Sequence, residues 1–161
     1  MIAPHGKPVR DSASEYSDFA LPNDANGLGN VLGGKVMHLV DLAGALSAMR
    51  HARRPVVTAS IDYMNFLYPV HIGQLIILRS SVNRVFRTSM EVGVKVLVED
   101  LMTGERRHTS SGYLTFVALD EQGTPVEIVP VIPETEDEIR RFREAGERRE
   151  YRLSLRKRSG K

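Results

Sequence analysis

The stretch from Asn30 to Arg53, which reads NVLGGKVMHLVDLAGALSAMRHAR, holds the longest helical pattern of the chain. Its apolar residues recur at intervals of three and four, the spacing of a helix with one buried stripe. They are Val36, Leu39, Val40, Ala43, Leu46 and Met49. Small residues at positions 43–45, 47 and 48 would let a sheet approach this helix closely. The sequence therefore predicts a fold built around one buried helix.

A glycine pair opens this helical pattern, and a single acid lies inside it. Gly33 and Gly34 permit a tight turn and leave unpaired amides at a helix N-terminus, where N–H groups and the helix dipole favour an anion or a polarised carbonyl oxygen. Asp41 lies beside the apolar stripe, and a carboxylate with restricted solvation is a good general base. On residue types alone, Asp41 is more often a structural acid that pairs with an arginine or an amide at a subunit interface.

The remaining chain reads mainly as strands. Strand-like runs cover residues 15–21, 56–70, 74–86, 88–101 and 105–119, and in the second run Val57, Ala59, Ile61 and Tyr63 fall on one side. Short connections near Arg87 and at residues 103–104 predict an antiparallel meander. One helix with about five strands is an α+β pattern. The pattern alone is compatible with a sheet wrapped around the helix, with a ferredoxin-like sheet and with a cystatin-like sheet.

The ends of the chain differ from its body. Residues 1–13 are polar and predict a flexible N-terminal arm, followed by one domain over 14–133 and by a C-terminal helix with a basic tail over 134–161. Thr135 and Glu138 form a capping box, so this helix should run from Glu136 to about Glu150. The last ten residues are expected to fray.

Composition excludes several classes of function. The chain has no cysteine, which removes disulfides, thiolate zinc sites and cysteine nucleophiles, and the motifs GxSxG and HExxH are absent. No segment is apolar enough for a signal peptide or a membrane span, so a soluble cytoplasmic protein without a membrane partner is expected. Residues 140–161 hold 10 of the 22 Lys and Arg, so the basic charge belongs to the tail and gives no indication of a nucleic-acid partner.

Several motifs in one order carry a resemblance to a known family. The segments LPNDANGLGNVLGGKVMHLVDLAGALSAMRHA, VVTASIDYMNF, RTSMEV and GYLTFVALDEQG resemble the hotdog-fold acyl-CoA thioesterases, in particular the YciA-like and brain-type acyl-CoA hydrolases. The resemblance runs from about Leu21 to Arg143. It implies a long antiparallel sheet wrapped around one central helix. It also implies hydrolysis of an acyl-CoA to a carboxylic acid and coenzyme A, without a metal or redox cofactor.

The same resemblance assigns roles to individual residues. Asp41 matches the essential carboxylate of the family motif GGxxMxxxD, where it either activates water or attacks directly. Asn30 matches the asparagine of GNVxGG, which helps hold the thioester or the attacking water. Gly34 matches the residue that supplies the oxyanion amide, with Gly33 beside it in the substrate site.

Binding of coenzyme A also requires residues that contact its phosphates. Arg87, Thr88 and Ser89 match the family loop GRTS, although Phe86 stands in place of its glycine. A basic turn with two hydroxyl groups can contact phosphate, but it can equally be only a turn. Arg53 and Arg54 at the helix end are equally good candidates.

Helix geometry separates the base from the oxyanion site. Asp41 is seven residues beyond Gly34, which corresponds to roughly 10 Å along one helix. The acid is therefore expected to act on a substrate bound at another subunit, so that a dimer is the smallest enzyme, and the resemblance implies a trimer of dimers. Two alternatives remain: a non-catalytic acyl-CoA binding module, and a hotdog enoyl-CoA hydratase that would pair His38 with Asp41.

Overall fold

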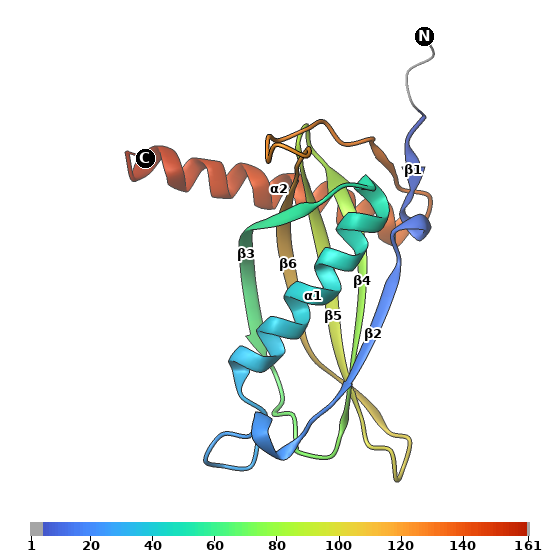
Figure 1. The fold of residues 1–161 in the computed structure, drawn as a ribbon, viewed down its shortest axis with the longest axis vertical. Helices are drawn as coiled ribbons and strands as arrows, with labels where there is room; N and C mark the ends of the chain where they lie inside the picture. The colour runs from blue at the N-terminus through green and yellow to red at the C-terminus, as the bar shows by residue number, and fades with distance from the viewer. Residues whose placement is uncertain (1–4, 161) are drawn as a thin grey trace.

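The computed structural model describes residues 5–160 and consists of a five-stranded antiparallel sheet packed around one long helix (Figure 1). The strand order is β2-β4-β5-β6-β3, and a short parallel pair joins β1 and β7. The strands are β1 Lys7–Pro8, β2 Ser14–Phe19, β3 Val56–Phe66, β4 Leu75–Val85, β5 Ser89–Glu99, β6 Arg106–Ala118 and β7 Val131–Ile132. The helices are α1 Gly33–Ala52 and α2 Glu136–Arg158, with 3-10 turns at Val9–Asp11 and Pro22–Asp24.

Helix α1 packs against the concave face of the sheet through its small and branched residues. Val36, Leu39, Val40 and Ala43 are all buried in one core with alternate residues of β4, β5 and β6. Gly44 lies so close to Phe116 that a Cβ there would approach its ring to 3.0 Å. The predicted close approach of sheet and helix is therefore confirmed.

One residue of the predicted buried stripe of α1 is exposed. Met49 is 41% exposed, and Ser47, Ala48 and His51 are buried instead. The expectation for Met49 was wrong because the sheet crosses the helix obliquely and contacts a different side of its last turns (Figure 1). Met49 thus joins Met37 and Leu42, each 40% exposed, as a large apolar side chain of α1 left uncovered by its own sheet.

Strand β3 forms one edge of the sheet and is irregular. Its register with β6 shifts between Thr58 and Ser60 and again between Asp62 and Asn65, and Tyr63 in the second shift has a φ of 28°. The predicted uninterrupted alternation of Val57, Ala59, Ile61 and Tyr63 is broken by these two bulges, because each adds a residue that the partner strand does not match. Val57, Ile61, Tyr63 and Phe66 of β3 are left exposed, with Tyr63 at 77%.

The described segments near the two chain ends are more regular than expected. The arm predicted over 1–13 is wrong for residues 7–13, because Lys7 and Pro8 pair with β7 and Val9 and Ser12 are buried. Residues 1–4 lie outside the described part. Helix α2 begins at the predicted capping box but continues to Arg158, so the expected fraying of the last ten residues is also wrong. Basic side chains in its last turn complement the negative end of the helix dipole.

His51, at the C-terminal end of α1, is fully buried and ties the helix to the segment before β7. Its Nε2 lies 2.7 Å from the carbonyl oxygen of Val129, and Nδ1 has no hydrogen-bond partner within residues 5–160. Because a carbonyl only accepts, Nε2 carries a proton, and no described group stands by to accept a second proton from Nδ1. Burial lowers the pKa of His51 below its usual value, more than the bond to Val129 raises it.

This lowered pKa predicts that acid destabilises the protein. Below a pH of about 6.5 the unfolded chain binds a proton at position 51 that the folded chain does not, so the free energy of unfolding should fall with decreasing pH until the folded pKa is reached. Urea unfolding at pH 7.5 and 5.5 measures this loss. His51→Gln should flatten it, whereas replacement of the exposed His38 by glutamine should not; equal slopes for both variants would contradict the assignment.

Candidate active site

The N-terminus of α1 opens onto a small cavity. Leu32 precedes the helix and supplies no side-chain cap, and within residues 5–160 the amides of Gly33 and Gly34 have no acceptor. A cavity of about 300 Å³ lies beside them, between the loop at residues 26–31 and the segment 66–70. The space next to Gly34 is open, since a Cβ there would meet nothing within 4 Å. The predicted pair of free helix-terminal donors is therefore present.

Two asparagines line this cavity and shape its loop. Asn26 closes the loop, because its Oδ1 accepts hydrogen bonds from the amides of Leu28 at 2.9 Å and Asn30 at 3.1 Å. The Oδ1 of Asn30 lies 2.9 Å from Nδ1 of His71. Because an amide oxygen only accepts, Nδ1 of His71 carries the proton, and the NH₂ group of Asn30 is the part left to donate to a ligand.

Asp41 lies on α1 away from this cavity and is held by a strand residue that sequence reasoning missed. The hydroxyl of Thr58 donates to its Oδ1 at 2.6 Å, beside the first bulge of β3. The carboxylate is partly buried, and its second oxygen is the one left for a substrate or a water molecule. Asp41 is not among the residues that line the cavity, whereas Gly33 and Asn30 are, so one chain does not bring Asp41 to this cavity.

The predicted phosphate loop lies at the far end of the molecule. Arg87, Thr88 and Ser89 connect β4 to β5 near the C-terminal end of α1, whereas the cavity is at the N-terminal end (Figure 1). The Arg87 side chain is 79% exposed and lies 3.9 Å from Glu127. Helix α1 has 20 residues and is thus about 30 Å long. Within one chain, this loop therefore lies about one helix length away from Asn30 and Gly34.

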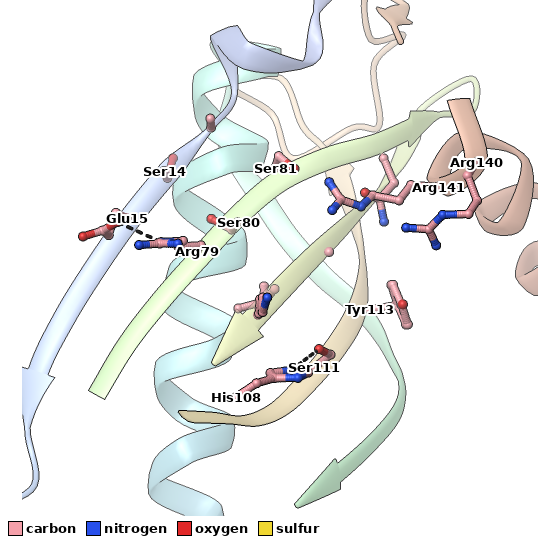
Figure 2. Close-up of a pocket in the computed structure, with 15 residues that line it drawn as sticks. Ser14, Glu15, Arg79, Ser80, Ser81, His108, Ser111, Tyr113, Arg140 and Arg141 are labelled. Carbon is pink, nitrogen blue, oxygen red and sulfur yellow. Dashed lines mark hydrogen bonds and ion pairs between the residues drawn. The ribbon is translucent and has the colours of Figure 1, made fainter. Parts of the chain in front are cut away.

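A larger hollow lies on the other face of the sheet and was not predicted. The hollow has a volume of about 720 Å³. Figure 2 shows Arg79, Ser81, Tyr113 and Arg140 among the residues that surround it. Residues of β4 and β6 that alternate with these point toward α1, so the hollow is separated from the α1 cavity by the sheet itself. Its size does not make it the reaction site, because none of the predicted catalytic residues lines it.

Two further features bear on the kind of site. Within residues 5–160 no group of three His, Cys, Asp or Glu side chains is arranged to hold a metal ion. No helix in that range is both long and apolar enough to cross a membrane.

A long antiparallel sheet curved around one helix, with free amides where that helix begins, defines a thioesterase-type hotdog protein. The model of the Thioesterase superfamily matches residues 28–105. An acyl-CoA thioester hydrolase of Bacillus subtilis, YkhA, is 43% identical over 139 residues, which cover 86% of this chain and 81% of YkhA. The chain belongs to the acyl-CoA thioester hydrolase family of this superfamily, and the predicted hotdog fold is confirmed.

Solved structures agree with this placement. An apo-hexameric acyl-CoA thioesterase superposes with a TM-score of 0.90 at 42% identity, covering 94% of this chain and 97% of that one. An acyl-CoA hydrolase of Staphylococcus aureus, solved with butyryl coenzyme A, coenzyme A and coenzyme A disulfide, has a TM-score of 0.88 at 33% identity and covers 96% of this chain and 94% of its own. Variants of that enzyme with an aspartate, an asparagine or a threonine changed to alanine have also been solved.

The contact between Thr58 and Asp41 predicts a measurable effect on catalysis. Thr58→Ala leaves the carboxylate free to rotate and removes a charge-assisted hydrogen bond of about 1.5 kcal/mol, so kcat for acyl-CoA cleavage should fall about tenfold. Thr58→Ser keeps the hydroxyl and should stay within about twofold of the wild type. Equal activity in the alanine and serine variants would show that the hydroxyl does not position Asp41.

Proposed function

We propose that this protein hydrolyses acyl-CoA thioesters to a free carboxylic acid and coenzyme A. The observation that carries the proposal is the carboxylate of Asp41, fixed by Thr58 on one side and free on the other, in a chain of the acyl-CoA thioester hydrolase family. The hydrolase of Staphylococcus aureus supports the substrate class, since it binds both butyryl coenzyme A and coenzyme A. The setting we propose is the cytoplasm, in fatty acid metabolism.

The chemistry needs only a carboxylate and hydrogen-bond donors. The amides of Gly34 and Gly33 would donate to the thioester carbonyl oxygen and stabilise the negative charge that forms on it. Asp41 would take a proton from water as the water oxygen attacks the carbonyl carbon; the C–S bond then breaks, and the thiolate leaves and is protonated. Direct attack by Asp41, followed by hydrolysis of the resulting anhydride, uses the same geometry. Neither route requires a metal or a redox cofactor.

The site is proposed to be shared between two subunits. Within one chain Asp41 does not line the cavity of Gly33 and Asn30, and it lies roughly 10 Å along the helix from Gly34. The exposed apolar residues of α1, such as Leu42 and Met49, and the unpaired edge of β3 offer a surface that a second copy can cover. A dimer is then the smallest active unit. We propose a trimer of dimers as the full assembly, as suggested by the similar hexameric thioesterase.

The Staphylococcus aureus variants add a second asparagine to the proposal. Their altered asparagine, aspartate and threonine are separated by 15 and then 17 positions. In this chain the same separations select Asn26, Asp41 and Thr58. Asn26 therefore stands beside the predicted Asn30 as a candidate to hold the thioester or the attacking water. Both line the α1 cavity, but the Oδ1 of Asn26 already accepts two backbone hydrogen bonds.

The residues that bind the phosphates of coenzyme A are proposed to come from a further subunit. Arg87, Thr88 and Ser89 lie where β4 meets β5, at the opposite end of the roughly 30 Å long α1 from the cavity, so they do not hold the phosphates of a substrate bound in their own chain. In an assembly of several copies, this loop of one chain can face the cavity of another. The hydratase alternative gains no support, because the exposed His38 makes no hydrogen bond to Asp41.

The first test concerns the base. Asp41→Asn keeps the shape of the side chain and should keep fold and assembly, but it removes the charge that activates water, so turnover should fall at least about a hundredfold. Free thiol released from acyl-CoA substrates of increasing chain length measures both the reaction and its preferred substrate. A variant that turns over like the wild type would remove Asp41 from the mechanism, and wild-type protein that releases no thiol would refute the proposed function.

The second test concerns the shared site. Asn30→Ala and Asp41→Ala should each be inactive, but after subunit exchange each mixed dimer would carry one site with both defects and one site with neither. Because half of randomly exchanged dimers are mixed, about a quarter of wild-type sites should return. Asn26→Ala mixed with Asp41→Ala tests the other asparagine in the same way. Mass spectrometry of differently tagged chains confirms exchange; complete exchange without recovery would place the site within one chain.

A further inference from the structure

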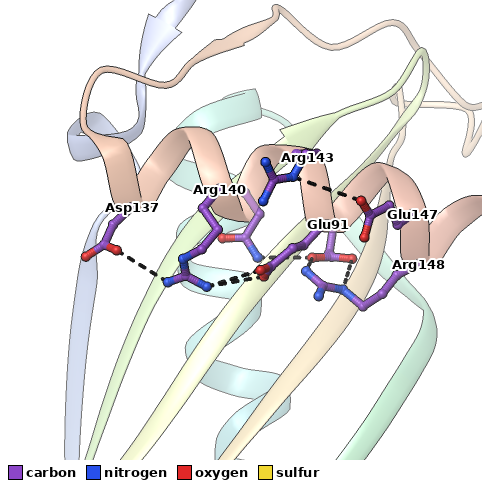
Figure 3. A network of polar contacts seen from close by, with 8 residues as sticks. Glu91, Asp137, Arg140, Arg143, Glu147 and Arg148 are labelled. Carbon is purple, nitrogen blue, oxygen red and sulfur yellow. Dashed lines mark hydrogen bonds and ion pairs between the residues drawn. The ribbon is translucent and has the colours of Figure 1, made fainter.

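Helix α2 lies across the outer face of the sheet, and Figure 3 shows the contact of Arg148 with Glu91 on β5 that holds it there. Other arginine contacts join α2 to β4 and β3. The guanidinium of Arg84 on β4 stacks on Phe142 of α2 at 4.2 Å from the ring centre. Further along, Arg148 binds Glu91 on β5, and Arg152 forms an ion pair with Asp62 on β3. The helix therefore crosses the sheet from β4 toward its β3 edge.

The contact between Glu91 and Arg148 fixes the helix most firmly. Glu91 is fully buried, and its carboxylate accepts hydrogen bonds from Nε and Nη2 of Arg148 at 3.0 and 2.7 Å and from Asn83 at 3.0 Å. The same guanidinium lies 3.6 Å from the ring centre of Tyr113 on β6. A two-point ion pair with a stacked ring permits little rotation, so the direction of α2 is set by the sheet beneath it.

The helix does not stop where its own sheet stops. Arg152 reaches β3, the last strand, and residues 153–158 continue beyond it; we call these residues the overhang (Figure 1). At 1.5 Å per residue the overhang is about 9 Å long, whereas neighbouring strands lie about 4.8 Å apart. It is thus long enough to cover two more strands.

The overhang also continues the contact face of α2. Ala145, Arg148 and Arg152 face the sheet and recur at intervals of three and four, and the next positions in that row are Leu155 and Arg156. Leu155 is 43% exposed, and Arg156 forms no ion pair within residues 5–160. The row that holds α2 on its sheet is therefore repeated where this chain has no sheet to contact.

We infer that the overhang clasps the outer face of a second copy of this chain, which continues the sheet beyond the edge of β3. The inference rests on the dimer of the proposed function, and it adds a contact on the face of the sheet opposite to the α1 cavity. A second copy is the occupant that fits, because the unpaired edge of β3 accepts a further strand and the sheet then continues under the helix. Leu155 and Arg156 would lie over the partner's first two strands, as Arg148 and Arg152 lie over β5 and β3 here.

Photo-cross-linking tests the position of the overhang. The chain has no cysteine, so Leu155→Cys can be labelled at one point with a benzophenone maleimide. Irradiation should join two chains, and peptide mapping should place the link within residues 56–66 or 106–118. Lys157→Cys, on the opposite side of the helix, is the matched control and should give at least about tenfold less product. Links within one chain only, or equal yields from both positions, would overturn the clasp.

Dimer dissociation gives a second measurement with a matched charge change. Leu155→Glu with Arg156→Glu should raise the dimer dissociation constant at least about tenfold without unfolding the separated subunits, since neither side chain supports its own sheet. Ser154→Glu with Lys157→Glu changes the net charge equally on the outward side and should have less than a twofold effect. Equal weakening by both pairs, or by neither, would overturn the clasp.

These outcomes are separable from the proposed function. Release of thiol from acyl-CoA by wild-type protein, together with no link from the labelled Leu155→Cys variant to a second chain, would refute the clasp alone. A link between chains in the labelled Leu155→Cys variant, together with no thiol release by wild-type protein, would refute the hydrolase and leave the clasp in place. Binding of the basic overhang to anionic vesicles, with loss of the link between chains when the vesicles are added, would show that its occupant is a membrane surface and would also overturn the clasp.

Discussion

The close packing of α1 against the sheet is the interaction on which the rest of the structure depends. Gly44 and its small neighbours let β5 and β6 approach the helix backbone, so one side of α1 fills the core completely. Any larger residue at Gly44 would press on Phe116 and cost about 1–3 kcal/mol by overpacking. Because the sheet contacts only that side, the other side of the same helix is left to present Asp41 and the exposed apolar residues around it.

The features that follow from local chemistry were predictable from the sequence. The glycine pair, the helical period of α1 and the capping box at Thr135 act over a few residues, and each appears where the pattern placed it except at Met49, which is exposed. The contact of Thr58 with Asp41 could not be predicted, because it depends on where two bulges shift β3 against the helix. The course of α2 beyond Glu150 was missed for a related reason: its arginines find their partners on strands 57 to 90 residues away.

The contacts that hold α2 on the sheet fix the orientation of the helix as well as contributing to the stability of the fold. A buried ion pair such as that of Glu91 and Arg148 gains little net free energy, because both charges lose their water, but leaving one partner alone costs about 3–5 kcal/mol. An apolar contact would tolerate sliding or rotation of the helix, whereas a paired carboxylate and guanidinium accept one alignment. The sheet thereby dictates where a very polar helix points, which its own composition could not.

The bulges of β3 also bear on the solubility of the free chain. A long, straight and apolar sheet edge invites further strands without limit and is a common start of aggregation. Here the two register shifts and the left-handed backbone of Tyr63 divide the edge into short straight runs. Such runs can accept one neighbour of matching shape but offer no uniform template for a third chain. The irregularity that sets Thr58 beside Asp41 therefore also protects a newly made chain until its partner arrives.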